Sequence, residues 1–235
     1  MNTLDRLIES GLHNIVQPLK LHMGCGQTRL EGYVNIDYPQ DKHNVMTSAA
    51  DAEADIVKDL VFPRLSVDEI RSHHFFEHLS RVIAIAQLVK WYYWLKVDGT
   101  LIIETPDFMT SVAQLMDENT QYDQKMCIVR HLTGDQAADW GYHKELWWNE
   151  RFETTLSVLG FHVVEIEKTQ WQHWPHLASI TVKAIKLERK EVDNQVDAAL
   201  SLLRESMVSE REAKTFAVWE GQLKDALKDI CRLED

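Results

Sequence analysis

A glycine-rich turn between two short apolar segments is the feature that most restricts how this chain can fold. Residues 19–23 alternate apolar and polar side chains and run directly into Gly-Cys-Gly at 24–26. Such alternation predicts a β-strand, and the glycines predict a tight turn whose backbone can approach a ligand closely. A second strand is predicted over residues 33–37, where it ends in Asp37. This stretch therefore predicts the start of an open sheet.

The chain as far as residue 187 continues this alternation of strand and helix. Further strands are predicted over 54–58, 67–73, 100–105, 161–168 and 178–187, and helices over 77–95, 108–135 and 145–159. This order predicts an α/β fold, with a doubly wound, Rossmann-like, mostly parallel sheet and helices on both faces. No helix fits between the last two strands, so we expect a terminal antiparallel strand pair.

Two glycines and one short connection refine this expectation. Gly99 and Gly160 each follow a predicted helix, where glycine commonly adopts a left-handed cap or turn. Only seven residues separate Gly26 from Val34. A parallel crossover usually needs a dozen or more residues, so the first crossover helix is expected to be reduced to a loop.

Residues 188–235 differ in character from the domain of residues 1–187. Apolar side chains recur there at helical spacing, and acidic residues outnumber basic ones. The pattern predicts a tail of one or two helices. Packing on the domain, packing on a second copy and a coiled coil are all compatible with it. We expect the tail to mediate homo-oligomerisation or the docking of a partner enzyme.

Charge and cysteine content exclude several classes of protein. The formal net charge of −12 disfavours nucleic acid as a partner. No apolar run approaches the length of a membrane span, and the N-terminus is typical of an amphipathic helix and not of a signal peptide. The three cysteines are far apart in the sequence, which suits a reducing compartment. We therefore expect a cytoplasmic protein.

The glycine turn and Asp37 together predict a nucleoside site. Asp37 follows Gly26 by eleven residues (37 − 26 = 11) and closes the second strand. A carboxylate there can accept hydrogen bonds from both hydroxyls of a ribose at the carboxyl edge of the sheet. A dinucleotide fingerprint would need a third glycine where Arg29 stands, and an acid about 20 residues further on. The sequence Gly-Lys-Ser/Thr of a P-loop is also absent.

These residues resemble the first motif of class I S-adenosylmethionine-dependent methyltransferases. More narrowly, the chain is similar to a group with ordered motifs that read L-H-x-G-C-G, G-Y-x-N-I-D, D-L and E-I-x-x-x-H-x-x-E-H-L. Proteins of this group are often encoded with enzymes of sugar and surface-polysaccharide biosynthesis. The motifs lie here at 21–26, 32–37, 59–60 and 69–79, and the likeness continues at 95–108 and 156–161.

The resemblance implies a methyltransferase domain over residues 1–187, with S-adenosylmethionine as cofactor and S-adenosylhomocysteine as product. Gly24, Cys25 and Gly26 would pass beneath the methionine part of the cofactor, and Asp37 would hold its ribose. Asp59 and Leu60 would lie beside the adenine, and His74 would lie near the sulfonium.

Methyl transfer to a hydroxyl is helped by a general base near the reacting atoms. Three residues at predicted strand ends or loops are candidates: His74, Asp107 and His143. Asp107 is equally well explained as the N-cap of a helix, and His143 as a surface or capping residue. The acceptor is expected to be a small molecule or glycan, methylated on a sugar hydroxyl. Trp171 and Trp174 could stack on a sugar ring, or they could cover the core.

A rival interpretation comes from the sequence H-F-F-E-H at 74–78. His74 and His78 could hold zinc with Glu77 as base, as in a metallohydrolase, if all three lay on one helix. We expect no metal there, because His74 is predicted at a strand end. Glu77 and His78 are also explained as the first turn of a helix. A further alternative is a binding or scaffold protein that keeps the fold without catalysis.

Overall fold

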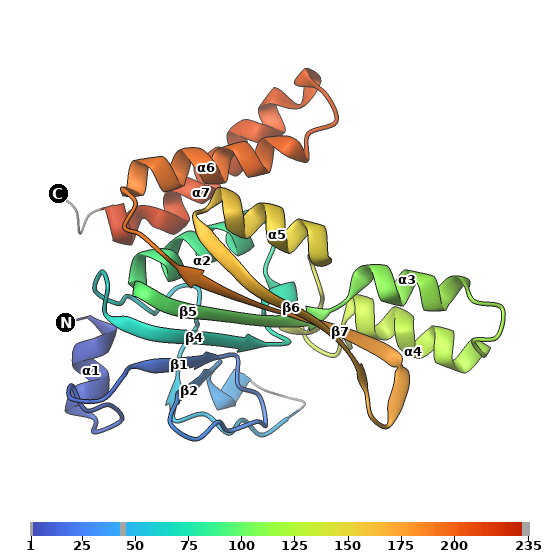
Figure 1. Cartoon of the computed structure of the whole chain (residues 1–235), viewed down its shortest axis with the longest axis horizontal. Coiled ribbons are helices and arrows are strands. Elements are labelled where there is room, and N and C mark those ends of the chain that lie inside the picture. Colours follow the sequence, from blue (N-terminus) through green and yellow to red (C-terminus); the bar gives the residue numbers. More distant parts are fainter. Residues whose placement is uncertain (1, 43–45, 232–235) are drawn as a thin grey trace.

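The computed structural model describes residues 2–42 and 46–231, and a seven-stranded sheet runs through its centre (Figure 1). The strand order is β3-β2-β1-β4-β5-β7-β6. All neighbouring pairs from β3 to β5 are parallel, whereas β7 is antiparallel to both β5 and β6. The predicted fold class is thereby confirmed. The strands are β1 (Lys20–Met23), β2 (Val34–Asp37), β3 (Ala52–Glu53), β4 (Val67–His73), β5 (Leu95–Pro106), β6 (Phe161–Trp171) and β7 (Trp174–Lys186).

The helices are unevenly distributed around this sheet. In Figure 1, α2 and α5 lie over one face, and the tail helices α6 and α7 form a further layer above them. Among the described residues, none of the helices is long and apolar enough to cross a membrane. The α-helices are α1 (Thr3–Glu9), α2 (Arg81–Trp94), α3 (Phe108–Met116), α4 (Tyr122–Thr133), α5 (Asn149–Val158), α6 (Val192–Glu205) and α7 (Ala213–Cys231). Single 3₁₀ turns are η1 (Gln40–Lys42), η2 (Phe76–His78), η3 (Asp139–Gly141) and η4 (Glu210–Glu212).

The tail packs on the domain, which is one of the arrangements that its sequence left open. Leu223 and Leu227 of α7 are fully buried and belong to the same apolar core as Trp91 of α2. Nearly every residue of α2 is buried, because this helix lies between the sheet and the tail. Self-association or partner docking through the tail stays a prediction.

Several predicted boundaries are wrong. Residues 54–58 form a turn and not a strand, because the Asp55 carboxylate accepts the N–H groups of Val57 and Lys58 in a local turn. The predicted helix over 77–95 begins only at Arg81. Gly99 is not left-handed; Asp98 takes that conformation instead, with φ +65°, because aspartate tolerates it better than most residues.

Other local expectations are confirmed. Gly160 has φ +90° directly after α5. In the described part of the chain no helix stands between β1 and β2, so the first crossover is a loop as its length requires. The predicted helical stretch 108–135 is present as α3 and α4, separated by residues 117–121. The loop from β1 to β2, all of which is described, thus builds one end of the sheet without a covering crossover helix.

Candidate functional site

The topology places a crevice between β1 and β4. From β1 the chain proceeds outward to β2 and β3, and it then returns to the other side of β1 to form β4 and β5. Loops that leave the carboxyl ends of strands at such a reversal diverge, and ligands bind between them. A cavity of about 500 Å³ lies there. We call it the switch-point pocket; its volume is within the range of small-molecule sites, roughly 300–1,000 Å³.

A larger hollow of about 710 Å³ lies elsewhere, among α2, α5 and α6. Its wall includes Glu145, which forms ion pairs with both Arg81 and Arg151. The Glu145 carboxylate is thus already engaged by two guanidinium groups, and the hollow is not at the strand ends. The switch-point pocket is therefore the better candidate site.

The glycine turn forms one wall of the switch-point pocket. Gly24 and Gly26 both line it, with φ values of +70° and +52°. A Cβ atom on Gly24 would stand 2.5 Å from Cβ of Phe75, so the backbone here packs directly on that side chain. A Cβ on Gly26 would meet only the Met46 sulfur, at 3.7 Å. The first glycine thus permits a close backbone contact, and the second leaves space beside the pocket.

Asp37 is held at the end of β2 by the loops around it. Its Oδ2 accepts the backbone N–H of Gly26, and its Oδ1 accepts that of Tyr38 at 2.6 Å. The Asp37 carboxylate is therefore fixed at the pocket wall by two backbone N–H groups.

The other residues of the predicted cofactor set are placed differently. Cys25 lies outside the pocket lining, where burial and the nearby Asp37 charge raise the pKa of its thiol to about 11. Asp59 does not line the pocket, and its carboxylate accepts the N–H of Asp55. Leu60 is 3% exposed and belongs to the core. From this part of the chain, Asp55 to Lys58 line the pocket instead. They include Asp55-Ile56, a second pair of an aspartate and an apolar residue that was not predicted as a cofactor contact.

His74 also lines the switch-point pocket, and it joins two carboxylates. It follows β4 with φ +47°, and its Nδ1 lies 3.1 Å from Oε1 of Glu77. Its Nε2 lies 3.3 Å from Oε1 of Glu104 and 3.2 Å from the Ser179 hydroxyl. Burial disfavours the charged ring, but hydrogen bonds to Glu104 and Glu77 outweigh it and raise the pKa of His74 to about 10. Both ring nitrogens of His74 are thus engaged.

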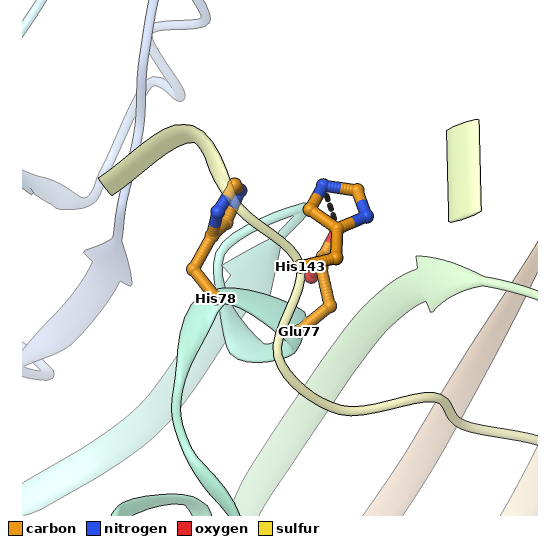
Figure 2. Close-up of side chains that lie close together, drawn as sticks. All are labelled: Glu77, His78 and His143. Carbon is orange, nitrogen blue, oxygen red and sulfur yellow. Dashed lines mark ion pairs between the residues drawn. The ribbon is translucent and has the colours of Figure 1, made fainter. Parts of the chain in front are cut away.

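Glu77 stands at the centre of a histidine cluster drawn in Figure 2. It is 1% exposed, and its Oε2 has no hydrogen-bond partner among the described residues. Nε2 of His143 lies 3.9 Å from its Oε1. The rings of His78 and His143 meet edge to face with centroids 4.6 Å apart. Two imidazoles from different segments therefore flank one buried carboxylate.

His143 reaches Glu77 because the loop after η3 is bound to the turn η2. The backbone N–H of Lys144 donates to the Glu77 carbonyl at 2.8 Å, and that of His143 donates to the Thr133 carbonyl at 3.1 Å. Burial lowers the pKa of His143 to about 4. Its Nδ1 is buried and has no partner in the part of the chain that the structure describes. The predicted loop histidine is thus neutral and inward-facing.

Asp107 lies apart from these residues. It begins α3, as its N-cap interpretation predicts, but its side chain makes no capping bond to the backbone. Its Oδ2 accepts the Thr110 hydroxyl and lies 3.0 Å from Nζ of Lys168. Of the three predicted catalytic residues, the structure brings His74 and His143 together around Glu77 and leaves Asp107 outside.

The hairpin between β6 and β7 reaches the same region. The Trp171 ring packs edge to face on His74, with centroids 5.8 Å apart, and its Nε1 donates to Ser179. Trp174 is 52% exposed. Both tryptophans therefore stand at the rim of the site and do not cover the core.

The literal H-x-x-E-H motif is not arranged as its metal interpretation requires. Residues 76–78 form one 3₁₀ turn, and His74 precedes it and turns toward Glu104. Within residues 2–42 and 46–231, the group whose ligand atoms all lie within 4.8 Å of one another is Glu77, His78 and His143. No sequence signal near the motif pointed to His143, because the contact depends on a distant loop.

Comparisons with known proteins were made on both sequence and structure. The chain matches no protein-family model and no curated protein sequence. A SAM-dependent methyltransferase from Methanosarcina mazei is similar in structure, with 13% identity, a TM-score of 0.48, and coverage of 77% of this chain and 98% of that one. A SAM-dependent methyltransferase from Archaeoglobus fulgidus is also similar in structure, with 15% identity and a TM-score of 0.48; the match covers 77% of this chain and 92% of that one. Likenesses this distant assign no role to any residue here.

Proposed function

We propose that this chain is an S-adenosylmethionine-dependent methyltransferase that acts on a hydroxyl group of a small molecule or glycan. The observation that carries the proposal is the Asp37 carboxylate, oriented at the end of β2 beside two left-handed glycines at the sheet's reversal point. This combination suits a nucleoside whose ribose hydroxyls donate to the carboxylate. The motifs that resemble class I methyltransferases supply these same residues.

Successive segments of the lining of the switch-point pocket can each be assigned to one part of this cofactor. Asp37 would hold the ribose, and the backbone at Gly24 and Gly26 would lie beneath the methionine part. Asp55 and Ile56 line the pocket beyond the end of β2, so we assign to them the adenine contact that the sequence assigned to Asp59 and Leu60. His74 closes the side where the sulfonium would stand.

The bound cofactor would supply an electrophilic methyl group on a positively charged sulfur. Transfer of this group to a hydroxyl would leave the sulfur–carbon electron pair on sulfur and would release the hydroxyl proton to a basic side chain or to solvent. The chain must hold the acceptor oxygen about 3–3.5 Å from the methyl carbon and exclude water. Glu77, Glu104 and the ring of Trp171 all contact His74, and we place the acceptor beside them.

Among the predicted catalytic residues, the contacts favour His143 for activation of the acceptor. Asp107 is engaged by Lys168 and Thr110. Both nitrogens of His74 are hydrogen-bonded, so we assign it to positioning Glu77. Nε2 of His143 lies 3.9 Å from Oε1 of Glu77, which is beyond hydrogen-bond distance, so no hydrogen bond to that carboxylate occupies it.

Features of the rim favour a sugar acceptor, in keeping with a role in polysaccharide biosynthesis. Trp171 and Trp174 are 37% and 52% exposed and pack on each other beside His74, and exposed indole rings suit the apolar side of a sugar ring. Lys144 lines the switch-point pocket and could pair with the phosphate of a nucleotide sugar.

The proposal is tested by calorimetry with S-adenosylhomocysteine and S-adenosylmethionine. Both are expected to bind the purified protein at one site with micromolar affinity, whereas NAD and ATP should not bind. A wild-type protein that binds neither sulfur compound would contradict the proposal. A screen of nucleotide sugars and glycans would follow, with transfer of a labelled methyl group as readout; binding without transfer to any acceptor would favour the scaffold alternative.

His143→Gln is expected to lower kcat on an identified acceptor by roughly 100-fold, in line with the loss of one acid–base or activating group. The KM for S-adenosylmethionine should change little, because His143 is not among the residues that line the switch-point pocket. The matched control is His162→Gln, which changes an exposed histidine on β6. Steady-state kinetics on the wild type, His143→Gln and His162→Gln checks that kcat falls while KM stays nearly constant. A raised KM with unchanged kcat in His143→Gln would count against this role.

A further inference from the structure

We propose that Glu77, His78 and His143 form a binding site for a divalent transition-metal ion. Their candidate ligand atoms, one carboxylate oxygen and two imidazole nitrogens, all lie within 4.8 Å of one another (Figure 2). Ligands of one zinc ion lie about 2.0–2.2 Å from it. The three side chains need to close by only about an ångström to share a cation, and half-buried His78 has room to move.

The carboxylate of this cluster is already set up as a ligand. Glu77 is almost fully buried, and its Oε2 lacks a hydrogen-bond partner among the described residues. A buried carboxylate oxygen without a partner is costly, and a bound cation would satisfy it. The other oxygen, Oε1, is held by His74. Metal ligands are commonly oriented by an outer hydrogen bond of this kind.

The two histidines have nitrogens available for a metal. Nδ1 of His78 lies 3.2 Å from the Tyr142 carbonyl. A carbonyl can only accept, so Nδ1 carries the hydrogen and Nε2 keeps its lone pair. In His143, Nε2 lies 3.9 Å from Oε1 of Glu77, beyond hydrogen-bond distance, so no hydrogen bond to that carboxylate occupies it.

The ligand set selects the class of ion. Two imidazoles and one carboxylate suit zinc and neighbouring transition metals, whereas calcium and magnesium prefer oxygen ligands. Three protein ligands leave coordination positions open, as in catalytic and not structural zinc sites. His78 also lines the switch-point pocket. The open positions are therefore next to the place where the proposed function puts the reacting groups.

A role for this ion in catalysis rests on the proposed function, whereas its binding does not. A cation at this cluster would hold the acceptor oxygen and lower the pKa of its hydroxyl, as zinc does for bound water. The proton would pass to solvent, and no free basic side chain would be needed. His143 would then act on the acceptor indirectly, through the metal ion that it binds. No metal was expected at residues 74–78 because His74 is predicted at a strand end; in the proposed site His143 stands in place of His74 beside Glu77 and His78.

The test uses the full chain, stripped with a chelator and titrated with Zn²⁺ in a buffer that does not bind metal. Calorimetry is expected to show one zinc ion per chain with micromolar or tighter affinity. His78→Ala should weaken binding by about 100-fold, since loss of even an outer partner of a ligand costs 10–100-fold. His78 is only half-buried, so this variant should fold, and its melting temperature checks that. The exposed His162→Ala serves as control.

Cobalt(II) substitution gives a second readout, because its visible absorption reports the number and type of ligands. Wild-type protein is expected to show the absorption of a cobalt site with nitrogen ligands, and His143→Asn should lose it. The inference would be overturned if the wild type did not bind zinc stoichiometrically. It would also be overturned if His78→Ala and His143→Asn bound zinc as tightly as the wild type does. S-adenosylhomocysteine titrated into the same samples separates the two proposals, since failure of zinc binding with intact cofactor binding rejects the metal site alone.

Discussion

Asp37→Asn is expected to weaken S-adenosylhomocysteine binding by on the order of 100-fold or more. The wild-type carboxylate would accept two charge-assisted hydrogen bonds from the ribose, and hydrogen bonds to a charged group contribute about 1.5–3 kcal/mol each. The loss of about 3 kcal/mol corresponds to roughly a 100-fold change in Kd. Asparagine keeps one oxygen that can accept the Gly26 N–H, so the glycine turn should keep its conformation, whereas the hydrogen bond from the Tyr38 N–H is lost with the second oxygen.

The matched control for this variant is Asp41→Asn. Asp41 lies on η1, close in sequence and with the same charge, but it is exposed. Calorimetric titration of both variants, with thermal melting to confirm folding, measures the difference. If Asp37→Asn bound as tightly as Asp41→Asn, the carboxylate would not be the ribose acceptor and the cofactor placement would be wrong.

Gly24→Ala is expected to lower the free energy of unfolding by about 3 kcal/mol or more. A left-handed conformation at an alanine costs about 1–2 kcal/mol, and overpacking adds about 1–3 kcal/mol. The overpacking arises because the new Cβ would stand 2.5 Å from Cβ and 2.7 Å from Cγ of Phe75. Phe75 itself lines the switch-point pocket. Any adjustment that relieves the contact should therefore also weaken cofactor binding.

Gly32→Ala separates the two causes. Gly32 has a similar φ of +79°, but a Cβ there would meet nothing within 4 Å. Its substitution should cost only the backbone strain, about 1–2 kcal/mol. Urea denaturation of wild type and both variants checks the comparison. Equal losses in the two variants would show that Phe75 does not restrict Gly24.

The sequence alone determined the class of fold and the glycine turn with Asp37 that line the switch-point pocket, because their signals are local. The alternation in β1, the two glycines and the acid that ends β2 lie within one short stretch. The connection between β1 and β2 was predicted as a loop from its length alone. A dipeptide motif was less informative. Asp55-Ile56 and Asp59-Leu60 have the same type of pattern, and only the turn closed by the Asp55 side chain decides which pair faces the pocket.

The other half of the site was decided by tertiary structure, because its residues meet through long-range pairing. The register of β4 on β5 sets His73 opposite Glu104, and that of β5 on β7 sets Pro106 opposite Ser179. This places Glu104 and Ser179 within reach of His74, which follows β4. His143 joins Glu77 only because a loop bonds across to η2. Periodicity along a chain carries no information about strand register or about which distant loop covers a turn, so those contacts had to come from the packed structure.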